Sequence, residues 1–264
     1  MPAETHPTSR KIDQLYFDDF EEGFLCVQCL KDIRFVKSTI CDKCGEPFPG
    51  EMSTPFTCEN CVQQEHNYDL ARSSTLSVSL MRDVLHQYKF MSATWFEPFL
   101  MRVFLQSAIP ALRNGGWDAI IPTPLHPVKF RERGFNQSDC MALCLAGQLR
   151  IPLMNNVLSR VRFTQPQSAL RREGRLVNVR GAFRVNRDVC LSGKKLILVD
   201  DVMTTGATVN ACAGALKKAG ALKVAVWTLA RGGLSADLAC SSADLALPPF
   251  RLFRAPLNEA SACP

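Results

Sequence analysis

The segment "LILVDDVMTTGAT", residues 196–208, decides how the rest of this 264-residue chain is interpreted. The apolar run Leu196 to Val199 has the length and composition of a strand that is buried on both faces of a parallel sheet. Asp200 and Asp201 follow at once, so they would emerge at the carboxyl end of that strand. Open α/β sheets bind their ligands at this end, and the sequence therefore predicts a ligand site around the two acids.

The loop after the two acids predicts an anion site. Gly206 allows the backbone to approach a ligand closely, while threonine hydroxyls and amides at the start of a following helix face a phosphate. Two carboxylates would repel that phosphate, so their expected partners are neutral hydroxyls or a divalent cation. A phosphate, two adjacent hydroxyls and a metal together describe a ribose 5-phosphate. The predicted loop consists of Met203, Thr204, Thr205, Gly206, Ala207 and Thr208.

Strand-like and helix-like segments alternate after about residue 68. An order of strand, helix, strand, helix and strand predicts an α/β fold, in which right-handed crossovers build a parallel sheet flanked by helices. The predicted helices cover residues 79–112, with a break at Pro98, 136–149 and 207–219. The predicted strands are "WDAIIPTP" (117–124), "KKLILVDD" (194–201) and "KVAVWTLA" (223–230).

Cysteine pairs in the first quarter of the chain predict a zinc ribbon. A C-x-x-C turn points two thiolates at one ion, and two such turns complete a tetrahedral four-cysteine zinc site. Six ligands are more than one site needs and fewer than two separate sites need. We favour Cys41/Cys44 with Cys58/Cys61, while the remaining pair joins a second site or replaces one of these pairs. The three pairs are Cys26/Cys29, Cys41/Cys44 and Cys58/Cys61.

The change in composition predicts two domains. Residues 1–66 would form the zinc-ribbon domain with a disordered N-terminal extension, and residues 67–264 the α/β domain. The ribbon is too small to bury much apolar surface, so zinc would supply its folding energy. No apolar stretch reaches the roughly 20 residues that a membrane helix needs, and the N-terminus lacks the basic-then-apolar order of a secretion signal. We expect a cytoplasmic protein without a membrane span.

Residues 196–208 resemble the 13-residue signature of type I phosphoribosyltransferases, which has four apolar residues, two acids and a Thr/Gly loop. The resemblance implies that Asp200 and Asp201 are the catalytic acids and hold the ribose 2- and 3-hydroxyls of phosphoribosyl pyrophosphate. It also implies that residues 203–208 wrap the 5-phosphate and that Mg2+ accompanies the substrate. The parallel sheet would then be that of a type I phosphoribosyltransferase.

The loop after the first predicted strand, residues 123–126, resembles the pyrophosphate loop of the same enzymes. Because Pro124 has no backbone N–H, this loop offers fewer donors than usual, and arginines would supplement it. The segment "RERGFNQ" (131–137) is alternatively a solvated turn before a helix that Asn136 caps, and capping and ligand contact can coexist. The predicted pyrophosphate-binding residues are Thr123, Pro124, Leu125, Arg131 and Arg133.

Three further segments are similar to the ComF/GntX family, which joins a cysteine-rich ribbon to this transferase domain. They are "IPTPLHP" (121–127), "RERGFNQS" (131–138) and "TQPQSALRREGRLVNVRGAF" (164–183), and the resemblance covers about residues 24–231. It implies structural Zn2+, a role in DNA uptake or utilisation and a DNA-uptake helicase as a partner.

An excess of positive charge lies between Lys129 and Arg187, where twelve Lys/Arg face three Asp/Glu in a chain of net charge +6. This segment is a mobile loop that binds pyrophosphate when closed, a solvated face, or a surface for single-stranded DNA. Two functions therefore remain open. One is an enzyme that transfers a phosphoribosyl group to an unidentified acceptor, and the alternative is a non-catalytic nucleotide-sensing or single-stranded DNA-binding protein.

Overall fold

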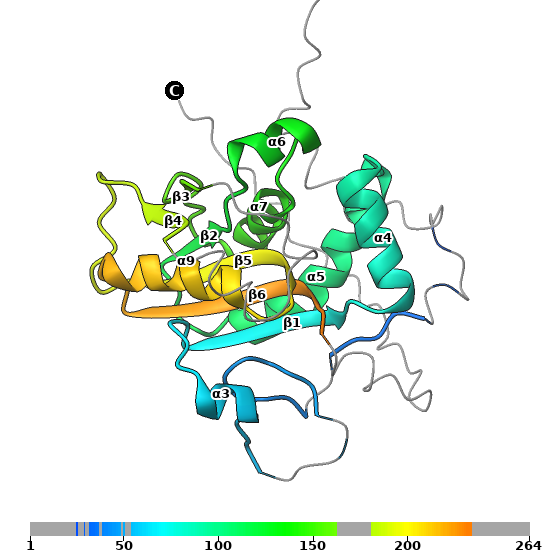
Figure 1. The fold of residues 1–264 in the computed structure, drawn as a ribbon, viewed down its shortest axis with the longest axis horizontal. Helices are drawn as coiled ribbons and strands as arrows, with labels where there is room; N and C mark the ends of the chain where they lie inside the picture. Colours follow the sequence, from blue (N-terminus) through cyan, green and yellow to red (C-terminus); the bar gives the residue numbers. More distant parts are fainter. Residues whose placement is uncertain are drawn as a thin grey trace, which may run out of the picture.

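The computed structural model describes residues 25, 29, 32–36, 39–48, 50, 54–162 and 181–233. Within these residues a parallel sheet of four strands forms the centre of the molecule, in the order β1-β6-β5-β2 (Figure 1). The predicted α/β fold with a parallel sheet is confirmed. Its strands are β1 (Leu70–Leu76), β2 (Ala119–Pro122), β5 (Lys195–Met203) and β6 (Lys223–Arg231).

Helices cover both faces of this sheet. Successive residues of β5 point to opposite faces, so each face contributes side chains to a separate apolar cluster. Ile197 and Val199 pack in one apolar cluster with α4, α5 and α7, whereas Leu196 and Leu198 pack in a second cluster with α9. The two clusters explain why the strand is apolar at every position from 196 to 199. The described helices are α3 (Glu59–Gln63), α4 (Ser79–Phe90), η2 (Thr94–Phe96), α5 (Glu97–Leu112), α6 (Pro127–Arg133), α7 (Gln137–Leu149) and α9 (Ala207–Lys218).

The break in the first long helical segment lies earlier than we predicted. α4 ends at Phe90 and α5 begins at Glu97, so Pro98 occupies the first turn of α5. A proline is tolerated there, because the N–H that it lacks would have no partner inside the helix. A short antiparallel pair, β3 (Leu158–Arg160) and β4 (Phe183–Val185), lies beside α9 (Figure 1).

The N-terminal cysteine-rich region packs along β1, at one edge of the sheet (Figure 1). The Ala71 N–H donates to the Lys43 carbonyl at 2.8 Å, and Phe35 pairs antiparallel with Thr75. Gly45 has φ +69°, and a Cβ there would lie 2.6 Å from the Ala71 carbonyl oxygen, so this approach requires glycine. The ribbon thus covers the edge that β1 would otherwise expose.

Two other expectations concern a membrane span and the N-terminal extension. None of the described helices is long and apolar enough to cross a membrane. The N-terminal extension that we expect to be disordered lies outside the described residues.

Candidate functional site

The two acids lie where β2 ends and β5 continues. Pro122 is the last residue of β2 and pairs with Val199, and the Thr123 N–H then donates to the Val199 carbonyl at 2.8 Å. β5 runs on to Met203 because β6 stays paired with it on the other side. Asp200 and Asp201 therefore belong to the last part of the strand rather than following it, and among the described strands only β6 pairs with this part of β5.

Asp200 is buried and hydrogen bonded. The residue is only 9% exposed. Its carboxylate oxygen Oδ1 accepts hydrogen bonds from the Ser138 hydroxyl at 3.1 Å and from the Asp201 N–H at 2.9 Å. Burial, with repulsion from Asp201, raises the pKa of Asp200 to about 7, although these hydrogen bonds and Lys89 act in the opposite direction. The environment of Asp200 therefore favours its protonated form up to a higher pH than that of an exposed carboxyl.

Asp201 forms an ion pair with a residue that the sequence did not indicate. The Lys89 ammonium lies 2.7 Å from Asp201 Oδ2, and both side chains are 16% exposed. The other oxygen, Oδ1, accepts from the Val202 N–H at 2.5 Å. Lys89 stands in the last turn of α4, so the contact joins a helix to a strand end that is remote in sequence.

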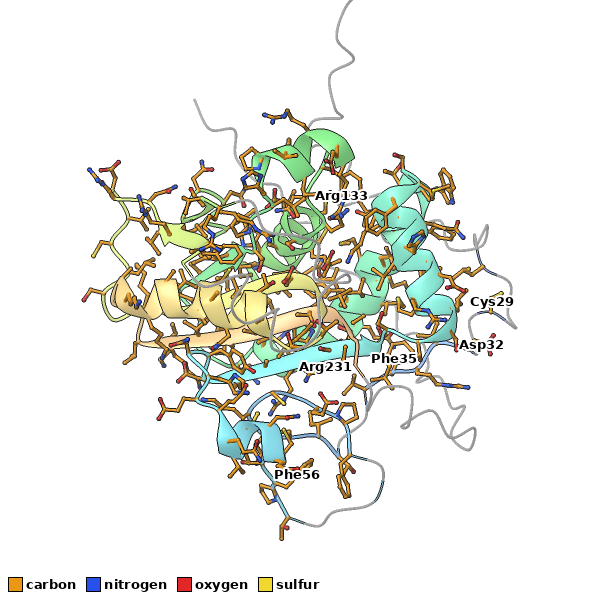
Figure 2. All side chains as sticks on the ribbon, in the orientation of Figure 1. Cys29, Asp32, Phe35, Phe56, Arg133 and Arg231 are labelled. Carbon is orange, nitrogen blue, oxygen red and sulfur yellow. The ribbon has the colours of Figure 1, made fainter. Side chains whose placement is uncertain are left out.

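Arg133 is the predicted arginine that the structure brings to the acids. It is the last residue of α6 (Figure 2). Its guanidinium lies 5.5 Å from the ring centroid of Phe90, at the end of α4, and donates a hydrogen bond to Gln137 at 2.5 Å. Burial lowers the pKa of Arg133, and attraction from Asp201 acts against that shift. Arg131 is exposed, and no contact with the acids is recorded for it among the described residues.

The predicted phosphate loop turns directly from β5 into α9. Gly206 has φ +75° and precedes the first residue of the helix, and a Cβ there would lie 2.8 Å from Met203 Cε. The Thr205 hydroxyl accepts from the Ala207 N–H at 3.4 Å. The first amides of a helix lack partners inside it and attract anions, so phosphate binding by residues 203–208 stays a prediction that this turn into α9 allows.

The predicted pyrophosphate loop lies on the β2 side of the acids. Thr123 is 4% exposed, and its hydroxyl has no hydrogen-bond partner among the described residues. The Asn136 side chain donates to the Thr123 carbonyl at 3.1 Å and accepts from the Ser138 N–H at 3.3 Å. Asn136 thus caps α7, as predicted, and also holds the loop, whereas ligand contact by the "RERGFNQ" segment stays a prediction. Pro124 and Leu125 are half-buried.

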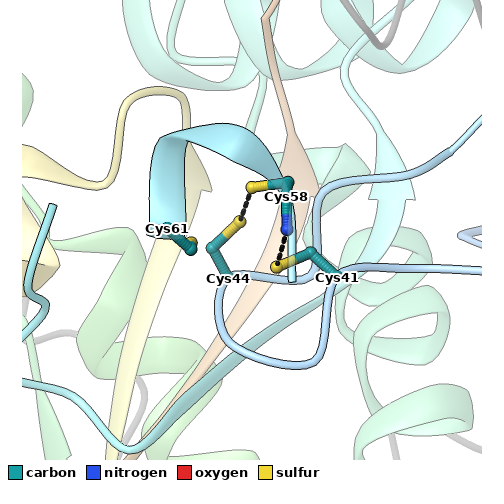
Figure 3. A group of neighbouring side chains, drawn as sticks. All are labelled: Cys41, Cys44, Cys58 and Cys61. Carbon is teal, nitrogen blue, oxygen red and sulfur yellow. Dashed lines mark hydrogen bonds between the residues drawn. The ribbon is translucent and has the colours of Figure 1, made fainter. Parts of the chain in front are cut away.

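The four cysteines that we favoured for zinc come together in one group (Figure 3). Their sulfur atoms all lie within 4.8 Å of one another, a donor set that fits a tetrahedral zinc ion. The Cys58 N–H donates to Cys41 Sγ at 3.3 Å, as expected for a thiolate ligand. Burial raises the pKa of Cys41, but N–H donors from Cys44, Cys58 and Lys43 outweigh burial and lower it to about 7. The group consists of Cys41, Cys44, Cys58 and Cys61.

Cys29 does not belong to this group. It lies beside Asp32, away from the ribbon that holds Phe56 (Figure 2). Its predicted partner Cys26 lies outside the described residues. Cys29 therefore does not replace a ligand of the four-cysteine group, and a second zinc site that includes this pair stays a prediction.

Two family models match the chain. A phosphoribosyl transferase domain model matches residues 164–239, and a double zinc ribbon domain model matches residues 18–62. With the parallel sheet and the cysteine group, these matches define a phosphoribosyltransferase-domain protein that carries an N-terminal zinc ribbon.

Relatives along most of the chain narrow this class. The chain is 30% identical over 224 residues to competence protein F of Haemophilus influenzae, covering 79% of this chain and 97% of that protein. It is 33% identical over 210 residues to the DNA utilization protein YhgH of Salmonella typhi, covering 78% of this chain and 90% of that protein. It is 26% identical over 219 residues to competence protein ComFC of Bacillus subtilis, covering 78% of this chain and 84% of that protein. The chain belongs to the ComF/GntX family.

Proposed function

We propose that this protein binds phosphoribosyl pyrophosphate and transfers its phosphoribosyl group to an acceptor. The observation that carries the proposal is the placement of Asp200 and Asp201 at the end of β5, immediately before the loop that opens α9. A sugar whose diol faces the carboxylates would present its 5-phosphate to the amino end of that helix. The match to a phosphoribosyl transferase domain supports the same substrate.

The transfer breaks the bond between C1 of the sugar and the pyrophosphate oxygen, and a new bond forms between C1 and the acceptor. Positive charge develops on the ring and negative charge on the leaving pyrophosphate, while the acceptor's proton passes to solvent. Asp200 and Asp201 would accept hydrogen bonds from the diol and face the positive ring. Arg133, on which Asp201 acts electrostatically, and the unpartnered Thr123 hydroxyl are described groups that could hold the leaving group.

The predicted Mg2+ does not fit the acids as they are arranged. Three of the four carboxylate oxygens are already engaged: Asp200 Oδ1 accepts from Ser138 and the Asp201 N–H, Asp201 Oδ1 from the Val202 N–H, and Asp201 Oδ2 from Lys89. Magnesium requires oxygen ligands in near-octahedral geometry, so it would have to displace the Lys89 ammonium to bind Asp201 Oδ2. We therefore assign the reaction only to side chains of the protein.

Titration calorimetry with phosphoribosyl pyrophosphate tests the binding, and release of pyrophosphate in the presence of candidate nucleobases tests the transfer. Asp201→Asn should weaken binding by about tenfold or more, because an amide cannot accept both diol hydrogen bonds as a carboxylate does. Asp83→Asn changes an exposed acid on α4 and should bind as the wild type does. Wild-type protein that binds no sugar pyrophosphate contradicts the proposal, and tight binding without release favours the sensing alternative.

We further propose a cytoplasmic role in DNA uptake or utilisation, supported by the names of the relatives. Binding of single-stranded DNA and of a DNA-uptake helicase would belong to this role. Arg184 and Arg187 of the basic segment are exposed, which favours a DNA contact. A gel shift with single-stranded DNA should weaken about tenfold when both become alanine and should depend on salt. Unchanged affinity would contradict this assignment, and Arg82→Ala serves as the control.

A further inference from the structure

Lys89 reaches the proposed sugar site from an element that the phosphoribosyltransferase signature does not include. It is the basic residue in the last turn of α4, and its ammonium lies 2.7 Å from Asp201 Oδ2. A lysine in the last turn of a helix can stabilise the helix through its dipole while the side chain extends into solvent. Here the Lys89 side chain is only 16% exposed, and its ammonium pairs with Asp201 instead of extending into solvent.

The local charge explains what this contact does. Asp200 and Asp201 are adjacent acids, and repulsion between them, added to burial, raises the pKa of Asp200. Two cationic groups act on this pair from other elements, namely Lys89 from α4 and Arg133 from α6. A pyrophosphate ester carries several negative charges, and two uncompensated carboxylates would repel it. A cation must therefore stand beside the acids before such a ligand can approach.

A divalent metal and the Lys89 ammonium would compete for the same oxygen. Asp201 Oδ1 accepts from the Val202 N–H, which leaves Oδ2 as the oxygen that faces the incoming cation, and Lys89 occupies it. An ammonium has three donors, so Lys89 can keep one hydrogen bond to Asp201 and direct others to substrate oxygens. One side chain can thus neutralise the acid and attract the ligand.

We propose that Lys89 is the resident cation of the acid pair, so that this protein binds a sugar pyrophosphate without requiring a divalent metal. The proposal rests on the proposed function, since it concerns how the same site receives its ligand. Lys89 acts as a positioning residue: it aims the Asp201 carboxylate and compensates its charge. When Lys89 is replaced by a neutral side chain, Asp201 Oδ2 becomes open and magnesium can bind there instead.

The test compares the dissociation constant for phosphoribosyl pyrophosphate with and without magnesium chloride. Divalent ions are removed from the buffer with a chelating resin before the zinc-loaded protein is added, and zinc content is measured afterwards, so that loss of zinc does not confound the result. The variants are Lys89→Met, which removes the charge, and Lys89→Arg, which keeps it. Arg82→Met is the matched control, because Arg82 is an exposed cation on the same helix.

We expect omission of magnesium to weaken wild-type binding by less than about threefold and Lys89→Met binding by more than about tenfold. Omission of magnesium should weaken Lys89→Arg and Arg82→Met binding by as little as it weakens wild-type binding. Wild-type binding that falls on magnesium omission as much as Lys89→Met binding overturns the inference. Magnesium-independent binding by Lys89→Met overturns it as well.

The two levels of the proposal fail in different ways. Wild-type protein that binds no sugar pyrophosphate even with magnesium overturns the proposed function and this inference with it. Wild-type protein that binds only with magnesium overturns the inference alone. The wild-type comparison needs no variant, so it decides the question even if Lys89→Met does not fold, which thermal unfolding would reveal.

Discussion

Asp200→Asn should make the fold less sensitive to pH. Burial and the neighbouring Asp201 raise the pKa of Asp200 from 3.8 to about 7 in the folded protein. An acid whose pKa is higher in the folded state stabilises the fold below its unfolded pKa, and this contribution is lost as pH rises through the window between the two values. Wild-type stability should therefore fall between about pH 4 and about pH 7 on account of this residue.

The size of the effect follows from linkage. One pKa unit corresponds to about 1.4 kcal/mol, so the wild type should lose about 2 to 3 kcal/mol at this residue between about pH 5 and about pH 8. Asparagine does not titrate, yet its amide oxygen can still accept from Ser138 and from the Asp201 N–H. Any fixed cost of the buried amide is the same at both pH values. The free energy of unfolding of the variant minus that of the wild type should therefore rise by about 2 to 3 kcal/mol across this interval.

Urea denaturation at the two pH values, extrapolated to water, measures this difference. Asp83→Asn is the control, because that acid is exposed and its replacement should change stability by less than about 0.5 kcal/mol at either pH. A difference between Asp200→Asn and the wild type that stays constant with pH would refute the argument. It would mean that the buried carboxylate is compensated fully in the folded protein.

Three other substitutions test separate contacts. Cys44→Ser should abolish zinc binding by the four-cysteine group, measured as metal content, and lower the thermal midpoint, since the ribbon depends on metal for its folding. Gly206→Ala should cost about 1 to 3 kcal/mol in urea titrations and weaken sugar-phosphate binding, because φ there is +75° and a Cβ would clash. Gly134→Ala is its control: φ is +83° but nothing lies within 4 Å of the added Cβ, so only backbone strain remains and ligand binding should persist. Arg231→Met should cost about 3 to 5 kcal/mol, since it leaves the Glu46 carboxylate without its ion-pair partner, and a double variant with Glu46→Gln should recover most of the loss. Equal stability of the single and double variants would argue against that pair.

Features that depend on neighbouring residues could be predicted from the sequence. The apolar run before Asp200, the glycine at the start of α9 and the cap of α7 by Asn136 each follow from local rules. The pairing of Cys41/Cys44 with Cys58/Cys61, which we favoured and which the structure confirms, rests on the short spacer between the two pairs, although the sequence left the role of Cys26/Cys29 open. These features position the phosphate loop and the zinc group.

Strand β1 could not be predicted from its composition. Three successive polar residues, Ser73, Ser74 and Thr75, are buried in it, which the pattern of a core strand does not suggest. Partners on other elements satisfy them: the Ser73 hydroxyl lies 2.7 Å from that of Thr228, and Thr75 donates to the Leu229 carbonyl at 2.9 Å. Burial of these groups costs little once such partners exist, but the partners are distant in sequence.

The contact of Lys89 with Asp201 in the candidate site could not be predicted either, because its partner is also distant in sequence. The pattern around Lys89 predicts a helix, yet nothing in that pattern indicates which of its polar residues faces Asp201. The contact depends on where the end of α4 lies relative to β5, and that placement results from packing of α4 and α5 in the apolar cluster on one face of the sheet. Residues that act through tertiary packing therefore need coordinates, whereas those in a contiguous loop do not.

The division predicted between residues 66 and 67 separates two compositions, and the contacts across it bear on how the ribbon relates to the site. Arg231, at the end of β6, donates to the Cys44 carbonyl at 3.0 Å and pairs with Glu46 of the same cysteine loop. In the sheet, Arg231 is opposite Met203, the residue that opens the predicted phosphate loop. Because Cys44 and Met203 also belong to one apolar cluster, the ribbon packs in the same core as the strand end that carries the acids. The metal that stabilises the ribbon is therefore expected to stabilise the end of β6 as well, and with it the backbone from which the phosphate loop departs.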